Sequence, residues 1–177
     1  KADSLKLTLT NACGEYPLAQ QVWEPGTQYP YPAPDKPLVL PDTIDPSFFD
    51  YGGDGIAYDD FTNENEGDGI RQDEGVDTEM KDEGHGSIGW INGGEWLEYS
   101  IRVERAFTAR FILRMAAAEP TNGSVDVLVN GETVASNLQA RNTGRWDNFE
   151  NMETSTITLS PGDSLLRLEF NQGKFNL

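Results

Sequence analysis

The chain has 177 residues and a formal net charge of −17, from 30 acidic and 13 basic residues. This charge excludes nucleic acid and anionic membranes as good partners, because both would be repelled. Neutral ligands and metal cations stay open. The length suits one domain with an extension, and the single cysteine, Cys13, excludes an internal disulfide. No stretch is apolar enough to span a bilayer and no signal peptide is visible, which fits a mature secreted domain or a cytosolic one.

The first quarter of the chain predicts one strand and one extended segment. Residues 5–10 alternate between apolar and polar side chains, as in a strand. Residues 17–46 contain eight of the ten prolines, so this part reads as an extended strap and not as a folded core. We therefore expect a strand within 1–10, a proline-rich linker over 11–43 and a folded domain over 44–177.

Acidic side chains concentrate in the next segment. Residues 45–83 contain fourteen Asp or Glu, against only Arg71 and Lys81. Two interpretations remain open, namely a solvated acidic surface and a cation site within glycine-rich loops. The composition alone does not choose between them.

The remainder of the chain predicts short antiparallel strands. The expected strands are residues 88–91, 95–103, 108–117, 124–129, 156–159 and 165–170, with the start of another at 175–177. Asn92-Gly93-Gly94 and Asn130-Gly131 are tight-turn signals. Short strands at regular spacing predict an all-β protein, a β-sandwich (jelly roll) of two antiparallel sheets.

One residue of the strand over 95–103 lies on an unexpected face. Side chains alternate along a strand, so Leu97, Tyr99 and Ile101 share an apolar face, while Trp96 lies among polar residues. A flat indole among polar groups suits a flat, hydroxylated and weakly apolar ligand such as a sugar ring. A second buried face or an oligomer contact would explain the same pattern.

Five stretches, in the expected order, carry a resemblance to a known family. They are the glycine-rich loop 51–58, residues 74–79, the pair Ile88-Gly89-Trp90-Ile91 and Gly94-Glu95-Trp96-Leu97-Glu98-Tyr99, the segment Asn142-Thr143-Gly144-Arg145-Trp146, and Gly173-Lys174-Phe175-Asn176-Leu177. From about residue 38 to 177 the chain resembles a family 6 carbohydrate-binding module, a β-sandwich usually appended to glycoside hydrolases.

The resemblance implies a sugar-binding cleft in the loops at one end of the sandwich. Trp90 and Trp146 match the two aromatic residues that clamp a sugar ring, Asn176 matches an amide that binds a hydroxyl, and Glu79 matches a loop carboxylate. Some members also bind along the concave sheet face, around a tryptophan at the position of Trp96. Indole faces stack on C–H faces of sugars, and Asn and Glu supply hydrogen-bonding groups. A core role for Trp90 or Trp146 is the alternative.

The resemblance also implies a structural calcium ion. Family members usually open with Glu-Ala-Glu, whose carboxylates help to hold the ion, and here Ile44-Asp45-Pro46-Ser47-Phe48 stands in that place. Asp45 could still bind Ca²⁺, which takes six to eight oxygen ligands. Ser47 is a poor replacement for Glu.

A second departure concerns the last strand of the family's sandwich, which should continue after Leu177. Residues 3–9 (Asp-Ser-Leu-Lys-Leu-Thr-Leu) are similar to the missing part. We therefore predict that residues 3–10 supply the closing strand, in the same molecule or in a neighbour, through a circular permutation or a repeat array cut out of phase. An N-terminal strand with a coincidental likeness is the alternative.

Three functions compete for this sequence. The first is non-catalytic binding of a polysaccharide, which would target a covalently attached glycoside hydrolase to its substrate. The second is an enzyme, but the acidic pairs Asp59-Asp60 and Glu95/Glu98 lie in no recognised catalytic motif, and the single histidine, His85, disfavours a multi-histidine zinc site. The third is a calcium-stabilised adhesion or scaffold domain without sugar binding.

The ligand is expected from the resemblance alone. The family binds xylan, β-glucans and agarose, and the acidic composition is similar to members from marine bacteria. This favours a β-glucan such as laminarin, or an agar-type galactan, and a secreted or cell-surface location in a bacterium.

Overall fold

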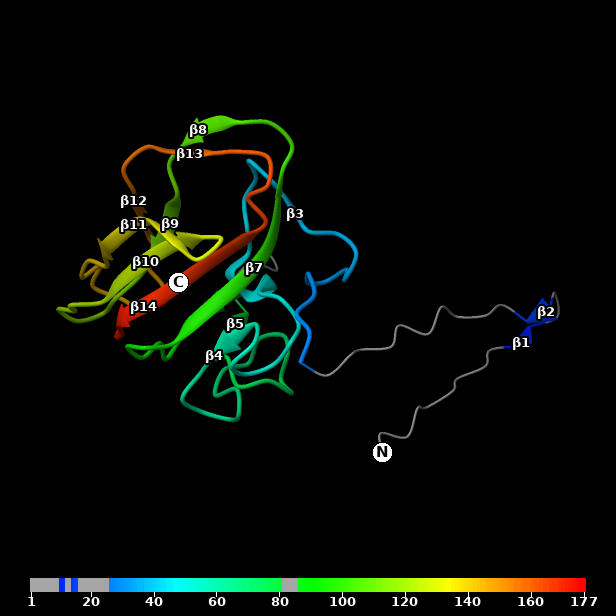
Figure 1. Cartoon of the computed structure of the whole chain (residues 1–177). Helices are drawn as coiled ribbons and strands as arrows, with labels where there is room; N and C mark the ends of the chain where they lie inside the picture. The colour runs from blue at the N-terminus through cyan, green and yellow to red at the C-terminus, as the bar shows by residue number, and fades with distance from the viewer. Residues whose placement is uncertain (1–9, 12–13, 16–25, 81–85) are drawn as a thin grey trace.

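A computed structural model describes residues 10–11, 14–15, 26–80 and 86–177 (Figure 1). In chain order the elements are β1 (Thr10–Asn11), β2 (Gly14–Glu15), β3 (Leu38–Leu40), the 3-10 helix η1 (Pro46–Phe48), β4 (Tyr58–Asp59), β5 (Thr78–Met80), β6 (Gly86–Ile88), β7 (Trp96–Val103), β8 (Phe107–Ala109), β9 (Ile112–Met115), β10 (Ser124–Val129), β11 (Glu132–Gln139), β12 (Glu150–Glu153), β13 (Ile157–Leu159) and β14 (Leu165–Gln172). The predicted all-β class is confirmed. The described residues contain no helix that is long and apolar enough to cross a membrane.

The larger layer is a six-stranded sheet. Its strand order is β11-β10-β14-β7-β3. Strands β3 and β4 both pair with the edge of β7 that lies away from β14, β3 at the C-terminal end of β7 and β4 at its N-terminal end. Strand β3 runs parallel to β7, and the other pairs are antiparallel. The segment 11–43, expected to be a linker, thus contributes a strand to this sheet.

The second layer consists of three strand pairs, β12–β9, β13–β8 and β5–β6. The last residues of the chain connect two of these pairs. Asn176 forms a bridge with Ala116, and Leu177 exchanges two backbone hydrogen bonds with Ile88, at 2.8 and 2.9 Å. This connection places Asn176 between β9 and β6, at the end of the sandwich where the candidate site lies.

The core lies between the two layers and follows the predicted alternation. In β7 the side chains of Leu97, Tyr99 and Ile101 are buried. The neighbouring strands β10 and β14 of the same sheet add Val125, Val127, Leu168 and Phe170, and the facing strands β9 and β12 add Met115 and Met152. The predicted turn at Asn130-Gly131 is confirmed, because both residues adopt positive φ (50° and 82°) between β10 and β11.

Two local expectations differ from the structure. The strand expected over 108–117 is interrupted, because Phe111 leaves the ladder and exchanges hydrogen bonds with Thr154, whose hydroxyl accepts from the Phe111 N–H at 3.0 Å. The turn Asn92-Gly93-Gly94 does not close a hairpin: β6 pairs with β5, and β7 belongs to the other sheet. The chain therefore crosses from one layer to the other between Trp90 and Trp96.

The predicted closing strand falls mainly outside the described residues. Residues 3–9 are not described, nor are Cys13 and His85. Thr10 belongs to β1 and pairs with Glu15 in a small two-stranded sheet of β1 and β2.

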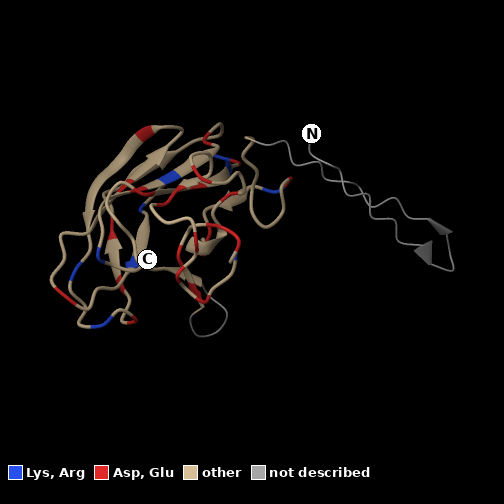
Figure 2. Cartoon of the chain, turned by 90° about the horizontal axis from the view of Figure 1, so that it is seen from below, with Lys and Arg blue, Asp and Glu red and all other residues tan. Residues whose placement is uncertain are grey.

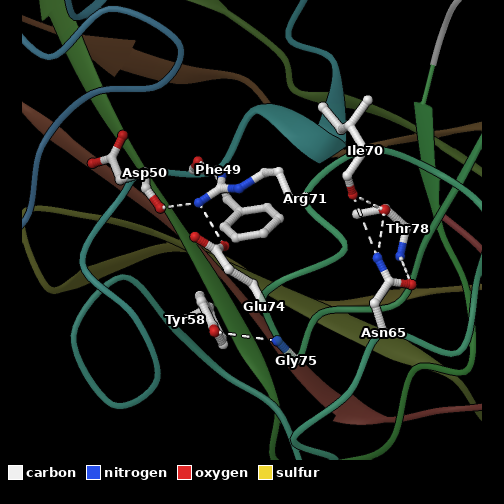
Figure 3. Close-up of polar contacts among 9 residues, drawn as sticks. All are labelled: Phe49, Asp50, Tyr58, Asn65, Ile70, Arg71, Glu74, Gly75 and Thr78. Carbon is white, nitrogen blue, oxygen red and sulfur yellow. Dashed lines mark hydrogen bonds and ion pairs between the residues drawn. The ribbon is translucent and has the colours of Figure 1, made fainter. Parts of the chain in front are cut away.

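The buried side chain of Arg71 lies beside Phe49, Asp50 and Glu74 (Figure 3). It also attaches the proline-rich segment to the sandwich through Tyr31. The Arg71 guanidinium lies 3.6 Å from the ring centre of Phe49 and 4.6 Å from that of Tyr31, a residue of the segment. It donates hydrogen bonds to the carbonyl oxygens of Phe49 and Asp50 and forms an ion pair of 2.7 Å with Glu74. Cation–π contacts of this desolvated kind are among the stronger ones.

We predict that Arg71→Met lowers the free energy of unfolding by roughly 3 kcal/mol, because the change leaves Glu74 and two carbonyl groups without their partner. Urea unfolding of wild type and variant measures this difference. Arg102→Met is the matched control, since Arg102 forms an exposed ion pair with Glu104 and should change stability by less than about 0.5 kcal/mol. Equal effects of the two substitutions would contradict the role given to Arg71.

Candidate functional site

The four residues predicted for the end cleft come from four separate parts of the chain and meet at one end of the sandwich. The Asn176 amide nitrogen donates to Glu79 Oε2 at 3.3 Å and to the Trp146 carbonyl at 3.1 Å. A Cβ atom at Gly89 would lie 3.3 Å from Glu79 Oε2 and 3.7 Å from Asn176 Oδ1. Trp90 follows Gly89 directly, so the fold brings all four residues together.

Both indoles of this group keep open surface. Trp90 is 48% exposed and Trp146 is 44% exposed, so neither fills the core. Trp90 has a φ of 47°, a left-handed conformation that is unusual for a bulky residue and tends to occur at functional positions. The Asn92 side chain donates to the Trp90 carbonyl at 3.0 Å and holds this turn.

The Trp146 loop is fixed by hydrogen bonds at its base. The N–H groups of Thr143 and Gly144 both donate to the carbonyl of Ala117, at 2.9 and 3.1 Å. Beside the indole, Arg145 and Asp147 form a two-pronged pair at 2.7 and 2.6 Å. These contacts hold Trp146 in one place while its ring faces solvent.

Glu79 is held from its own strand and from a neighbouring loop. It lies in β5, directly after Thr78, which accepts a hydrogen bond of 2.8 Å from the Asn65 amide and donates to the Ile70 carbonyl (Figure 3).

Asn176 is buried, and its amide nitrogen already donates to Glu79 and Trp146. Asn176 therefore positions the other two residues, and a contact of its oxygen with a sugar stays a prediction.

Trp96 lies on the solvent face of the six-stranded sheet, as its place in the strand pattern predicted. Its indole is half-buried. The guanidinium of Arg167, on the neighbouring strand β14, lies 3.9 Å from the ring centre, and the same guanidinium forms an ion pair of 2.6 Å with the buried Glu98. The alternation of β7 located Trp96 correctly, but nothing in that strand could reveal an arginine from residue 167.

A buried carboxylate organises the turn between Trp90 and Trp96. Glu95 accepts hydrogen bonds from the Asn92 N–H at 2.8 Å, from the Asn92 side chain at 3.0 Å and from the Phe61 N–H at 3.4 Å. Burial raises the pKa of Glu95, and the hydrogen bonds from Asn92 oppose that shift. Because Glu95 and Glu98 are both buried and both already paired, they do not form the exposed carboxylate pair of a glycosidase.

A hollow adjoins the end site. Its polar lining includes Asn92, Thr121, Asn122, Gln172 and Lys174. Sequence reasoning did not single out these residues for a site, because they come from three separate parts of the chain, although Lys174 lies in the last of the motif stretches and Asn92 in a predicted turn. The loop of Lys174 leads directly to Asn176, so the hollow and the four predicted residues share one end of the sandwich.

Acidic residues outnumber basic residues in the chain, 30 to 13. Figure 2 shows Asp and Glu positions spread over the loops, with far fewer Lys and Arg positions. Among the described residues, no group of three or more His, Cys, Asp or Glu side chains has the arrangement of a metal site.

The predicted calcium ligand Asp45 has another role in this structure. One oxygen accepts from the Ser47 N–H at 3.0 Å and from the Ser47 hydroxyl at 2.6 Å, and the other accepts from the Gly86 N–H at 2.9 Å. Asp45 is thus the N-cap of η1. The Oδ1 atom of Asp45 thus accepts two hydrogen bonds and Oδ2 accepts one. A structural calcium ion, with Asp45 among its ligands, stays a prediction.

The comparisons with known proteins agree with one family. Residues 66–177 match the model of carbohydrate binding module (family 6). The chain is similar to the C-terminal family 6 module of LamC, a marine laminarinase from Zobellia galactanivorans, with 30% identity, a TM-score of 0.51, and coverage of 57% of this chain and 82% of that one. It also shares the fold of a family 6 module from Clostridium cellulolyticum solved with xylose, at 19% identity, a TM-score of 0.50, and coverage of 58% and 81%.

The chain belongs to family 6 of the carbohydrate-binding modules. Its function is carbohydrate binding, and the module is not an enzyme, because the family is non-catalytic. The half-exposed indoles of Trp90 and Trp146 and the polar groups beside them are the chemistry that such binding needs.

We predict that Asp45→Ala lowers the free energy of unfolding of the module by about 1–2 kcal/mol, the usual cost of losing an N-cap. Thermal or urea unfolding in EDTA and in millimolar Ca²⁺ measures it. Because the three hydrogen bonds of Asp45 need no metal, the loss should be the same in both buffers. A loss that appears only with Ca²⁺ would instead show that Asp45 is a calcium ligand.

A second prediction concerns pH. Burial raises the pKa of Asp77 to about 6, although its carboxylate accepts from the Glu66 N–H at 2.6 Å. The unfolded pKa is near 3.9, so the folded state binds the proton more tightly, and the contribution of Asp77 to stability falls as pH rises from about 4 to about 6. Asp77→Asn keeps an oxygen acceptor and removes the charge, and should stabilise the module at pH 7 by up to about 3 kcal/mol.

Urea unfolding between pH 4 and pH 7 tests this prediction. The difference between Asp77→Asn and wild type should shrink towards pH 4, where folded Asp77 is protonated and unfolded Asp77 is close to its own pKa and about half protonated. Asp35→Asn is the control for removing one charge from an exposed position and should leave the profile close to that of wild type. A profile of Asp77→Asn parallel to wild type would contradict the assignment.

Proposed function

We propose that the module binds a β-1,3-glucan of the laminarin type through the end site, which consists of Glu79, Trp90, Trp146 and Asn176. The observation that supports this most is that Asn176 joins Glu79 to the Trp146 backbone at one end of the sandwich, beside the Gly89-Trp90 segment, while both indoles stay half-exposed. Indole faces stack against the C–H faces of a sugar ring, and the polar groups accept or donate to its hydroxyls.

The similar module of the Zobellia galactanivorans laminarinase supports the choice of glucan. An agar-type galactan is the second candidate, because both polymers are neutral where unsubstituted, and the net charge of −17 would repel an anionic polysaccharide. A site in end loops suits the termini of a chain, and the solvent face around Trp96 suits internal stretches.

Binding would act by proximity. A module that holds a covalently linked glycoside hydrolase on its polymer raises the local substrate concentration for that enzyme. Affinity at a single site should be modest, since open and hydrated sugar sites gain little net free energy per hydroxyl. A polymeric substrate of this kind implies a secreted or cell-surface protein.

We predict that Trp90→Ala and Trp146→Ala each weaken binding to laminarin by about tenfold or more, because each removes one stacking surface worth roughly 1–3 kcal/mol. Electrophoresis in gels that contain laminarin, agarose or xylan identifies the polymer that retains the module. Calorimetry with that polymer then measures the loss of affinity. The melting temperature should barely change, as both rings are half-exposed.

Ile112→Ala is the matched control, because Ile112 on β9 is also an exposed large apolar residue. It should bind like wild type. Normal retention of both tryptophan variants would exclude the end site. Absence of retention of wild type on every polymer would favour the calcium-stabilised adhesion domain.

A further inference from the structure

Residues 26–37, called the Tyr-Pro strap below, lie against the sandwich without joining its core. None of their side chains is fully buried, and the first buried core residue after them is Leu40. Four of these residues are prolines, which have no backbone N–H to donate. Tyr29 makes the only backbone hydrogen bonds between the strap and the rest of the described chain, two with Tyr51 at 2.9 and 2.8 Å. The strap is therefore attached mainly by its side chains.

Tyr31 is the side chain that holds the strap in place. Its ring centre lies 5.2 Å from that of Phe48, in an edge-on arrangement, and 4.9 Å from that of Tyr51. The Arg71 guanidinium lies 4.6 Å from the Tyr31 ring centre. Two rings and a cation thus surround one tyrosine, and ring–ring and cation–π attraction act on it together.

The surface that receives the strap is held by contacts within the sandwich. Arg71 donates to the carbonyl oxygens of Phe49 and Asp50. It also pairs with Glu74 at 2.7 Å (Figure 3). The buried Asp50 carboxylate accepts from the Ser100 N–H at 2.9 Å and from the Ser100 hydroxyl at 2.6 Å. None of these bonds involves the strap, so the receiving surface is built without it.

The strap has the chemistry of a bound peptide. Its Gln28 side chain donates to the Asp50 carboxylate at 2.8 Å, which adds one directional contact to the aromatic ones. Aromatic and proline residues alternate along Tyr29-Pro30-Tyr31-Pro32. Proline-rich ligands dock on aromatic surfaces in this way, because their prolines limit the conformational entropy that docking removes.

We propose that the Tyr-Pro strap is an intramolecular ligand, which docks on the surface around Arg71 and leaves it while the sandwich stays folded. Segments open locally where few backbone hydrogen bonds and little buried apolar surface hold them, and residues 26–37 meet both conditions. Strand β3 follows the strap and pairs with three residues of β7, so the opening ends there. The occupant of the surface is the chain's own segment 28–34.

Docking of the strap sets the reach of the chain on its N-terminal side. In the docked state a Cβ atom at Gly26 would lie 4.0 Å from Ile56 Cδ1, so the chain meets the sandwich at this point. Release of residues 26–37 adds a segment that spans at most about 40 Å when extended. A partner attached on that side would then work farther from the module, at a lower effective concentration near a bound polymer. The inference goes beyond the proposed ligand and does not rest on it.

Hydrogen exchange of the full chain, measured for single amides by NMR, tests the proposal in wild type, Tyr31→Ala and Tyr31→Phe. The Tyr29 and Tyr51 amides donate to each other's carbonyl oxygens, so their exchange reports docking. Tyr31→Ala should speed it about tenfold or more, because the ring and cation contacts are lost. The amides of Val125 and Val127, in the middle of the larger sheet, should exchange as in wild type. Tyr31→Phe keeps the ring and should retain slow exchange.

A synthetic peptide of residues 26–37 shows whether the surface is a binding site for this segment. Added at millimolar concentration to the Tyr31→Ala chain, the peptide should restore slow exchange of the Tyr51 amide, since it competes with a weakened strap. The same peptide with the Tyr31→Ala change should have no effect. Phe61→Ala is the matched control in the full chain, because it removes an exposed aromatic ring outside the strap, and it should leave the Tyr29 and Tyr51 amides unchanged.

Four results would each overturn the proposal. Unchanged exchange of the Tyr29 and Tyr51 amides in Tyr31→Ala would show that Tyr31 does not hold the strap. Equal acceleration at Val125 and Val127 would show that the strap opens only with the whole sandwich. No effect of the intact peptide would exclude a binding site, and a dimer in light scattering would place the strap on a second copy. Laminarin binding by Tyr31→Ala should equal that of wild type, so this inference and the proposed ligand fail in different measurements.

Discussion

The buried carboxylate of Glu95 is the constraint on which the arrangement of the binding surfaces depends. It accepts hydrogen bonds from the backbone and side chain of Asn92 and from the backbone of Phe61. Asn92 in turn holds the Trp90 carbonyl. One desolvated group thus fixes the turn that leaves the β5–β6 layer, the loop after β4 and the first residue of β7. Hydrogen bonds to a charged, buried acceptor are stronger than neutral ones. Such bonds suit a turn that has to keep the side chains on either side of it in fixed positions.

The crossing between the two layers explains why two aromatic surfaces lie so close together. Trp90 ends one layer and Trp96 begins the other, with only the glycine-rich turn between them. A residue before this turn projects from the end of the sandwich, whereas a residue after it projects from the face of the larger sheet. Gly94 contributes a second property, because the absence of a side chain there lets the Phe61 ring approach the sheet.

The sequence predicted the parts of this arrangement that are local. Alternation in β7 located Trp96 on the solvent face, and the ordered motifs located Trp90, Trp146, Asn176 and Glu79, which the fold does bring together. It could not predict contacts between residues far apart in the chain. Arg167 over Trp96, Arg71 among the aromatic rings of Phe49 and Tyr31, and Phe61 over Gly94 all depend on strand register or on loop paths, and no periodicity within one segment encodes them. Asp45 also has a role that its motif position did not predict, the N-cap of η1, while its part in a calcium site stays a prediction.

The acidic surface is compatible with this function because the carboxylates near the aromatic rings are not equivalent. Glu98 is neutralised by Arg167, and Glu95 is buried and satisfied by N–H donors. Asp59 and Glu169 lie opposite Trp96 on the two neighbouring strands, and Glu169 also pairs with the Arg167 guanidinium, at 3.3 Å. The Asp59 carboxylate is a strong acceptor for hydroxyl groups. The net negative charge has little effect on a neutral polymer, whose hydroxyl groups can donate to the nearby carboxylates. A sulfated or carboxylated polymer would be repelled both by the net charge and by these carboxylates. Under the proposed function, charge therefore selects against anionic polysaccharides before any ring stacks on the sugar, and the aromatic residues then discriminate among the neutral polysaccharides.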